Sequence, residues 1–285
     1  MGFQKIEVKP LTGALGAEVF GPDLSKKLDR QTFDEVHQAL LGNLVIFFRD
    51  QKITPQEQLR FAKRFGPIHS HPYMKGMEDC PQVLKISRTP DDPRAFGNAW
   101  HSDQMFVPTP ALGTMLYGVT IPQPGGDTLF ANMYDAYDAL SPGMKRMLGK
   151  VRTWAVGDKF KKFGGEKRAD RWKGKATMRA KEPPKGLQTE SSHPLVRTHP
   201  KTKRKGLYFG NHVQKFMDMS DEESEMLLTF LRKHVIKPEF TCRFRWEEGS
   251  LAFWDNRCTQ HYAVDDYSGQ TRVMTRVTIR GDKPV

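Results

Sequence analysis

Short apolar runs bounded by turn residues recur along the whole chain of 285 residues, and they limit its fold more than any other feature. Short runs rich in Val, Ile, Phe and Trp are typical of β-strands. Such runs occupy residues 44–48, 83–86, 114–121, 240–246, 250–254 and 272–280. These runs occur throughout the sequence and are most frequent near its end. They therefore predict a mainly β protein built as a single sandwich or barrel.

Helical spacing of apolar residues adds flanking helices to this β core. Residues 29–41 form one such segment, and a second opens at Thr54 with a capping box. Residues 133–148 predict a third helix. The last predicted helix follows Ser220, and we expect its His234 to face solvent. The residues expected on its inward face are Met226, Leu227, Phe230 and Leu231.

The composition is typical of a soluble chain in a reducing compartment. Mean hydropathy is −0.62, and no apolar run approaches the roughly 20 residues that a membrane-spanning helix needs. The three cysteines are scattered and odd in number, which does not suggest a disulfide framework. The first residues lack the apolar stretch of a secretory signal. We therefore expect a cytoplasmic protein with no membrane partner.

The net charge of +12 comes from one part of the chain, residues 145–205, where Lys and Arg far outnumber Asp and Glu. A basic segment can bind nucleic acid, or it can attract an anionic small molecule. This segment contains no nucleic-acid-binding motif, so we favour a solvated insertion at about residues 150–192. The expected organisation is one domain of residues 1–285 that carries this insertion and has no nucleic-acid partner.

His101 and Asp103 form a pair that can share a metal ion if the backbone is extended, because residues i and i+2 of a strand point to one face. A second histidine, His261, lies far downstream. Two histidines and one carboxylate on one side of a metal leave positions open, which suits non-haem Fe(II). Arg272 and Arg276 share a face of the last predicted strand. A buried arginine there can grip a carboxylate with two hydrogen bonds.

Four motifs in order give the chain a resemblance to a known family. They are Trp100-His101-Ser102-Asp103, Gly125-Gly126-Asp127-Thr128, the stretch from Trp254 to Ala263, and Arg272. This order resembles the taurine dioxygenase family of Fe(II)/2-oxoglutarate-dependent dioxygenases, which includes the dichlorophenoxyacetate dioxygenases. The resemblance spans nearly the whole chain and is strongest from residue 193 to residue 283.

The resemblance implies a double-stranded β-helix, or jelly roll, in which His101, Asp103 and His261 ligate Fe(II). It also implies that Thr128 and Arg272 hold the distal carboxylate of the cosubstrate 2-oxoglutarate, and that O2 binds last. The implied reaction hydroxylates a substrate C–H bond and releases succinate and CO2, with desaturation as an open alternative. No catalytic side chain beyond the metal ligands is expected.

The resemblance further implies a small anionic organic substrate. Taurine dioxygenases hold a sulfonate with an arginine that matches Arg276 and a histidine that matches His71. Other substrate positions depart from the family, because Met74, Gly97 and His212 stand where the family has Tyr, Asn and Phe. Asn98 lies one residue from the position of the missing Asn. A further Phe position of the family falls near Phe160 or Phe163. We therefore expect another sulfonate, or a carboxylate such as an aryloxyalkanoate, to contact His71, Arg276, Asn98 and His212.

Two alternatives to this reading stay open. Taurine itself is the alternative substrate. A basic, nucleic-acid-binding β-sandwich with a vestigial metal site is the alternative of another class. Members of the family often form dimers or tetramers, and the sequence leaves open whether this chain forms such a homo-oligomer.

Overall fold

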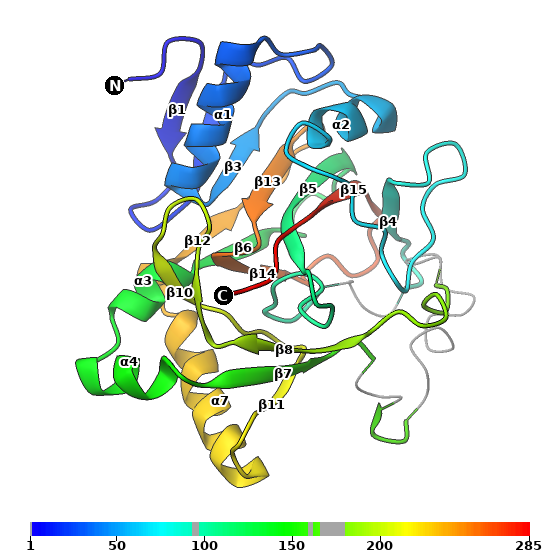
Figure 1. Cartoon of the computed structure of the whole chain (residues 1–285). Coiled ribbons are helices and arrows are strands. Elements are labelled where there is room, and N and C mark those ends of the chain that lie inside the picture. Colours follow the sequence, from blue (N-terminus) through cyan, green and yellow to red (C-terminus); the bar gives the residue numbers. More distant parts are fainter. Residues whose placement is uncertain (1, 93–96, 159–161, 166–179) are drawn as a thin grey trace.

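The structure, a computed structural model, describes residues 2–92, 97–158, 162–165 and 180–285 (Figure 1). Its largest element is a seven-stranded sheet with the order β1-β2-β3-β13-β5-β15-β4. Its strands are β1 (Glu7–Pro10), β2 (Ala17–Phe20), β3 (Val45–Phe48), β13 (Leu251–Asp255), β5 (Ala111–Thr120), β15 (Arg272–Arg280) and β4 (Leu84–Arg88). Early and late segments of the chain therefore pair side by side, and β13 lies between β3 and β5.

A second sheet packs against the large one and has the order β12-β6-β14. Its strands are β12 (Thr241–Phe244), β6 (Thr128–Asn132) and β14 (Thr259–Ala263). Phe47 of β3 stacks on Phe244 of β12 with ring centroids 3.9 Å apart, and Trp254 of β13 packs on Phe130 of β6. Apolar side chains from both sheets form one buried core. The prediction of a mainly β protein with flanking helices is confirmed.

The basic segment, residues 145–205, contains two neighbouring strands of a third sheet, which has the order β11-β7-β8. Its strands are β7 (Arg152–Val156), β8 (Glu190–Pro194) and β11 (Val213–Phe216), and a two-stranded ribbon of β9 (Val196–Thr198) and β10 (Lys205–Leu207) lies nearby. Because β7 and β8 pair antiparallel, the connection leaves this sheet after Val156 and returns at Glu190. The range predicted for the insertion thus includes sheet strands at both ends, while its residues 159–161 and 166–179 lie outside the described part.

Helices flank these sheets (Figure 1). They are α1 (Arg30–Asn43), α2 (Pro55–Ala62), α3 (Met133–Asp138), α4 (Pro142–Leu148) and α7 (Asp221–Val235). The prediction of a single helix over residues 133–148 is wrong, because α3 ends at Asp138 and a new helix begins at Pro142. Ser141 caps α4 by accepting from the backbone N–H of Met144, and Pro142 takes the first helical position. No helix in the described residues is long and apolar enough to cross a membrane.

The inward face predicted for α7 is partly wrong. Met226 is 72% exposed and Phe230 is 43% exposed, whereas Leu227, Leu228 and Leu231 are buried. His234 is also buried, contrary to expectation, and its Nε2 lies 2.7 Å from the carbonyl oxygen of Ala136. The apolar stripe alone does not decide which face is buried, because α7 packs on α3 and β11 along the side that also carries this histidine.

Candidate metal centre and substrate pocket

Three side chains that could hold a metal ion, those of His101, Asp103 and His261, meet at one buried point. Nε2 of His101 lies 3.7 Å, and Nε2 of His261 lies 3.8 Å, from Oδ1 of Asp103. One ligand atom from each residue lies within 4.8 Å of the other two, and all three side chains are buried. These separations leave room for one ion between the three atoms, so the sequence prediction that these residues converge is confirmed.

Backbone pairing brings the two histidines together. The N–H of His101 donates to the carbonyl of His261 at 3.1 Å, and the N–H of His261 donates back at 2.9 Å. They form an isolated antiparallel bridge with ring centroids 4.1 Å apart. The extended backbone predicted for the His-Asp pair is confirmed only at His101. A turn includes Asp103, so its carboxylate reaches the same point from a turn and not from a strand.

Hydrogen bonds aim one oxygen of Asp103 at the histidines. Its Oδ2 accepts from Oγ1 of Thr114 at 2.7 Å and from Nδ2 of Asn256 at 3.2 Å, which leaves Oδ1 toward the two rings. Nδ1 of His101 lies 2.6 Å from the carbonyl oxygen of Ala99. Because a carbonyl only accepts, Nδ1 carries the proton and the lone pair of Nε2 is left for an ion.

The electrostatics favour the protonation states that metal ligands need. Burial opposes the charge on Asp103, but Arg276, His261 and His101 outweigh it and hold the pKa of this carboxyl well below its usual range. Burial, followed by the neighbouring His101, holds the pKa of His261 well below its ordinary value. The site therefore presents a carboxylate and a neutral imidazole, as metal binding requires.

A cavity at His101 and His261 is also lined by Thr128, Arg272 and Arg276, together with apolar side chains such as Ile86 and Leu116. Both arginines of β15 face this one space, as their even spacing predicted. Nε and Nη2 of the buried Arg272 have no hydrogen-bond partner among the described residues, and burial lowers its pKa. A buried cation with unused donors fits a carboxylate ligand.

Thr128 and Gly126 lie next to Arg272 at one end of this cavity. Oγ1 of Thr128 accepts from the indole Nε1 of Trp246 at 2.9 Å, so its hydroxyl hydrogen is left to donate to a ligand. Gly126 has a φ of +75°, and a Cβ there would lie 3.2 Å from Nε of Arg272. The glycine before Asp127 thus allows the chain to turn close to the guanidinium.

His71 lies beside a neighbouring cavity. It is buried, and its Nδ1 accepts from the backbone N–H of Tyr73 at 3.1 Å. Met74 and Leu84 line the same cavity, and they pack against Ile86 of the metal-side cavity. The two cavities are therefore neighbours, with Met74 and Leu84 in the lining of one packed against Ile86 in the lining of the other.

The other predicted substrate residues, Asn98 and His212, are not in the lining of the metal-side cavity. Asn98 is exposed, and its Nδ2 donates to the Tyr262 hydroxyl at 2.9 Å and to the Ala263 carbonyl at 3.1 Å. Gly97 lines the cavity instead. Nδ1 of His212 lies 3.2 Å from the carbonyl of Val156. Phe163 is 64% exposed, and Phe160 lies outside the described residues.

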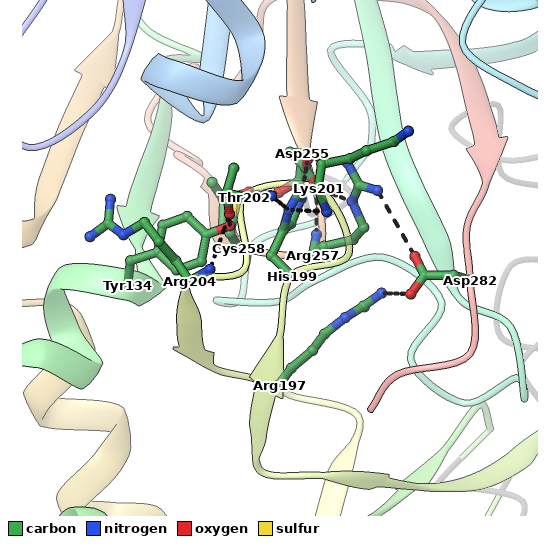
Figure 2. Close-up of polar contacts among 11 residues, drawn as sticks. Tyr134, Arg197, His199, Lys201, Thr202, Arg204, Asp255, Arg257, Cys258 and Asp282 are labelled. Atoms are coloured by element: carbon green, nitrogen blue, oxygen red, sulfur yellow. Dashed lines mark hydrogen bonds and ion pairs between the residues drawn. The ribbon is translucent and has the colours of Figure 1, made fainter. Parts of the chain in front are cut away.

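Sequence reasoning missed a second buried cluster, drawn in Figure 2. His199, Asp255 and Cys258 are close enough to hold a metal, but His199 has both ring nitrogens in use. Its Nε2 lies 3.1 Å from Oδ2 of Asp255, and its Nδ1 accepts from the backbone N–H groups of Lys201 and Thr202. The cluster is therefore a hydrogen-bond network and not a second metal centre.

This network fixes the turn between β13 and β14. Asp255 accepts from Nε of Arg257 at 2.8 Å and from its Nη2 at 2.6 Å. Figure 2 shows Arg257 and Arg197 approaching the same carboxylate, that of Asp282. The turn held in this way carries Asn256, which orients Asp103. The motif from Trp254 to Ala263 signals this turn, whereas the pairing with His199 has no local signal.

Comparisons with known proteins agree with this geometry. The family model described as "Taurine catabolism dioxygenase TauD, TfdA family" matches residues 7–278. An alpha-ketoglutarate-dependent sulfate ester dioxygenase of Pseudomonas putida is 36% identical over 99% of this chain and 91% of its own length. A taurine dioxygenase structure from Burkholderia xenovorans has a TM-score of 0.83 at 34% identity, covering 99% of this chain and 91% of that one. The structure of AAD-2 in complex with Mn(II) and N-oxalylglycine has a TM-score of 0.79 at 30% identity and covers 99% of both chains.

The fold, the site and the relatives together define an alpha-ketoglutarate-dependent dioxygenase, an oxidoreductase that uses a metal ion and alpha-ketoglutarate. Alpha-ketoglutarate and 2-oxoglutarate are the same compound. The chain belongs to the TauD/TfdA family.

Proposed function

We propose that this enzyme binds Fe(II) through His101, Asp103 and His261 and oxidises a small organic anion. The observation that carries the proposal is the position of Oδ1 of Asp103, 3.7 Å and 3.8 Å from the two histidine nitrogens. Two histidines and one carboxylate with open positions suit non-haem iron. The two packed sheets around this point support the jelly-roll architecture expected of a single domain spanning residues 1–285.

Thr128 and Arg272 are proposed to hold the distal carboxylate of 2-oxoglutarate. Support comes from the unused donors of the buried Arg272 and from the hydroxyl hydrogen of Thr128. A carboxylate there would compensate the charge of the guanidinium. Iron and 2-oxoglutarate together supply, from O2, the oxidising power that hydroxylates a C–H bond, with release of succinate and CO2.

The contributions of the protein are binding, orientation and exclusion of water. Ile86 and Leu116 give the cavity an apolar wall, and Trp254 lines it together with the proposed ligands His101 and His261. Arg276 lies at the metal side of the cavity, where its charge can hold an anionic group while the adjoining carbon faces the metal centre. His71 lines the neighbouring cavity, and we propose that it also contacts the anionic group of the substrate. Asn98 and His212 are proposed to contact the substrate as it enters.

Sulfate esters are the first substrate class we propose, followed by sulfonates and carboxylates. A sulfate ester dioxygenase is among the similar proteins, and a tetrahedral anion suits the fork of Arg276. Hydroxylation at the carbon next to the ester oxygen would release an aldehyde and sulfate. Taurine is a less favoured substrate because Met74 and Gly97 replace two of its expected contacts.

The test is a screen for succinate release from 2-oxoglutarate over alkyl sulfates, sulfonates and aryloxyalkanoates. We expect one class to be turned over, and Arg276→Leu to raise its KM at least about tenfold, the loss of a charged hydrogen bond, without changing the KM for 2-oxoglutarate. Arg280→Leu, at the exposed end of the same strand, is the matched control. Absence of succinate from iron-loaded protein with every anion would reject the proposal, and an equal effect on both KM values would reject the role of Arg276.

A further inference from the structure

We propose that Arg276 couples metal binding to anion binding, because its guanidinium competes with the metal for one oxygen of Asp103. The inference deepens the proposed function and rests on it in one respect, the assignment of Arg276 as the contact of the anionic group. Its consequence is that an anion in the pocket tightens the metal, and that the metal tightens the anion.

The competition is for a single atom. Nη2 of Arg276 lies 2.6 Å from Oδ1 of Asp103, and the same Oδ1 faces both histidine nitrogens. The other oxygen, Oδ2, is held by Thr114 and Asn256. The carboxylate therefore cannot satisfy the arginine with one oxygen and a metal with the other unless those hydrogen bonds break.

Arg276 has little else to compensate its charge. Its side chain is buried, and Asp103 is its single acidic partner within the described part of the chain. Leu84 and Leu116 lie directly opposite it on the two neighbouring strands. A buried charge without a partner is costly. A divalent cation on Oδ1 would thus leave Arg276 undercompensated and close to a like charge.

The guanidinium is also free to take a second acceptor. Its contact with Asp103 falls outside hydrogen-bond geometry, and its Nε and Nη2 have no hydrogen-bond partner among the described residues. An anion bound by these donors would restore the charge balance once the metal occupies Oδ1. Because binding free energies are linked, each ligand must raise the affinity of the other by the same factor.

The experiment is a calorimetric titration of the whole chain with Mn(II), in potassium sulfate and in potassium chloride of equal ionic strength. Sulfate is expected to lower the Kd for Mn(II) about tenfold in the unmodified protein, within the usual range of such couplings. Arg276→Gln should bind Mn(II) more tightly than the unmodified protein in chloride and should not respond to sulfate. Arg280→Gln removes an arginine at the exposed end of the same strand, outside the cavity lining, so it should keep the sulfate effect.

Three results would overturn the proposal: no sulfate effect in the unmodified protein, a sulfate effect that persists in Arg276→Gln, or weaker Mn(II) binding by Arg276→Gln with a native circular dichroism spectrum. Persistence would mean that sulfate acts on metal binding without Arg276. If Arg276→Gln does not fold, Arg276→Met, which matches the apolar neighbours, replaces it with the same expectations. The titration requires no 2-oxoglutarate and no turnover, so an inactive protein with intact coupling would reject the proposed function alone.

Discussion

Asn256 holds Asp103 at two points: its Oδ1 accepts from the backbone N–H of Asp103 at 3.1 Å, and its Nδ2 donates to the Oδ2 of Asp103 at 3.2 Å. The same Oδ1 accepts from the indole Nε1 of Trp254 at 3.1 Å. One buried amide thus sets both the backbone position and the carboxylate orientation of a proposed ligand. Residues that orient ligands in this way influence metal affinity strongly.

Asn256→Ala should therefore weaken Mn(II) binding about 10- to 100-fold, as expected when a group that orients a ligand is lost. It should also lower the free energy of unfolding by about 1–3 kcal/mol, because buried donors lose their acceptor. Titration calorimetry and urea unfolding measure the two effects. Asn43→Ala, which removes a hydrogen bond to Ala39 at the end of α1, is the control and should leave Mn(II) affinity unchanged. Equal Mn(II) affinities of the two variants would contradict the role of Asn256.

Arg272→Lys should weaken 2-oxoglutarate binding about tenfold or more, because lysine keeps the charge but loses the two-pronged hydrogen bond. The measurement is the visible absorption that develops when 2-oxoglutarate is titrated into the Fe(II) protein without oxygen. Mn(II) affinity should change little, because Arg272 does not contact Asp103. Arg280→Lys, on the exposed end of β15, is the control, and an unchanged 2-oxoglutarate affinity in Arg272→Lys would reject its role.

The buried His193 predicts loss of stability in mild acid. Burial lowers its pKa from 6.5 to about 4, and its Nε2 lies 2.7 Å from the carbonyl of Met105. As the pH falls below 6.5, His193 becomes protonated in the unfolded chain, whereas in the folded chain it stays neutral down to about pH 4. The contribution of His193 is thus complete above pH 6.5 and falls by about 1.4 kcal/mol per pH unit within that window. His193→Gln keeps a donor to Met105, so its unfolding free energy should depend less steeply on pH; identical slopes would contradict this.

Two positions on α7 test the corrected inward face. Leu228 is fully buried, so Leu228→Ala should cost about 2–5 kcal/mol of unfolding free energy. Met226 is 72% exposed, so Met226→Ala should change it by less than about 0.5 kcal/mol. Urea unfolding of both variants decides, and a larger loss at Met226 would restore the face predicted from sequence.

The site was predictable from sequence wherever its residues belong to local motifs. The His101–Asp103 pair, the turn before Thr128 and the even spacing of Arg272 and Arg276 each lie within a few residues. The structure brings these side chains to one cavity. Local spacing carries this information because strand and turn geometry fix where neighbouring side chains point.

The parts that sequence reasoning missed depend on long-range pairing. β7 and β8 lie within the basic segment, and the pairing of β7 with both β8 and β11 identifies them as strands of a sheet. The bond between His199 and Asp255 likewise joins residues from distant motifs. The buried His234 depends on the carbonyl of Ala136, a residue of another helix. No periodic pattern encodes such partners.

The backbone bridge between His101 and His261 has a consequence for folding. The two residues are far apart in the sequence, so the chain must close a long loop before both proposed ligands exist together. A nascent or partly unfolded chain offers the ion at most one local pair. The metal should therefore bind only after β14 has paired with β6. It should stabilise the folded protein and should not direct the order in which the chain folds.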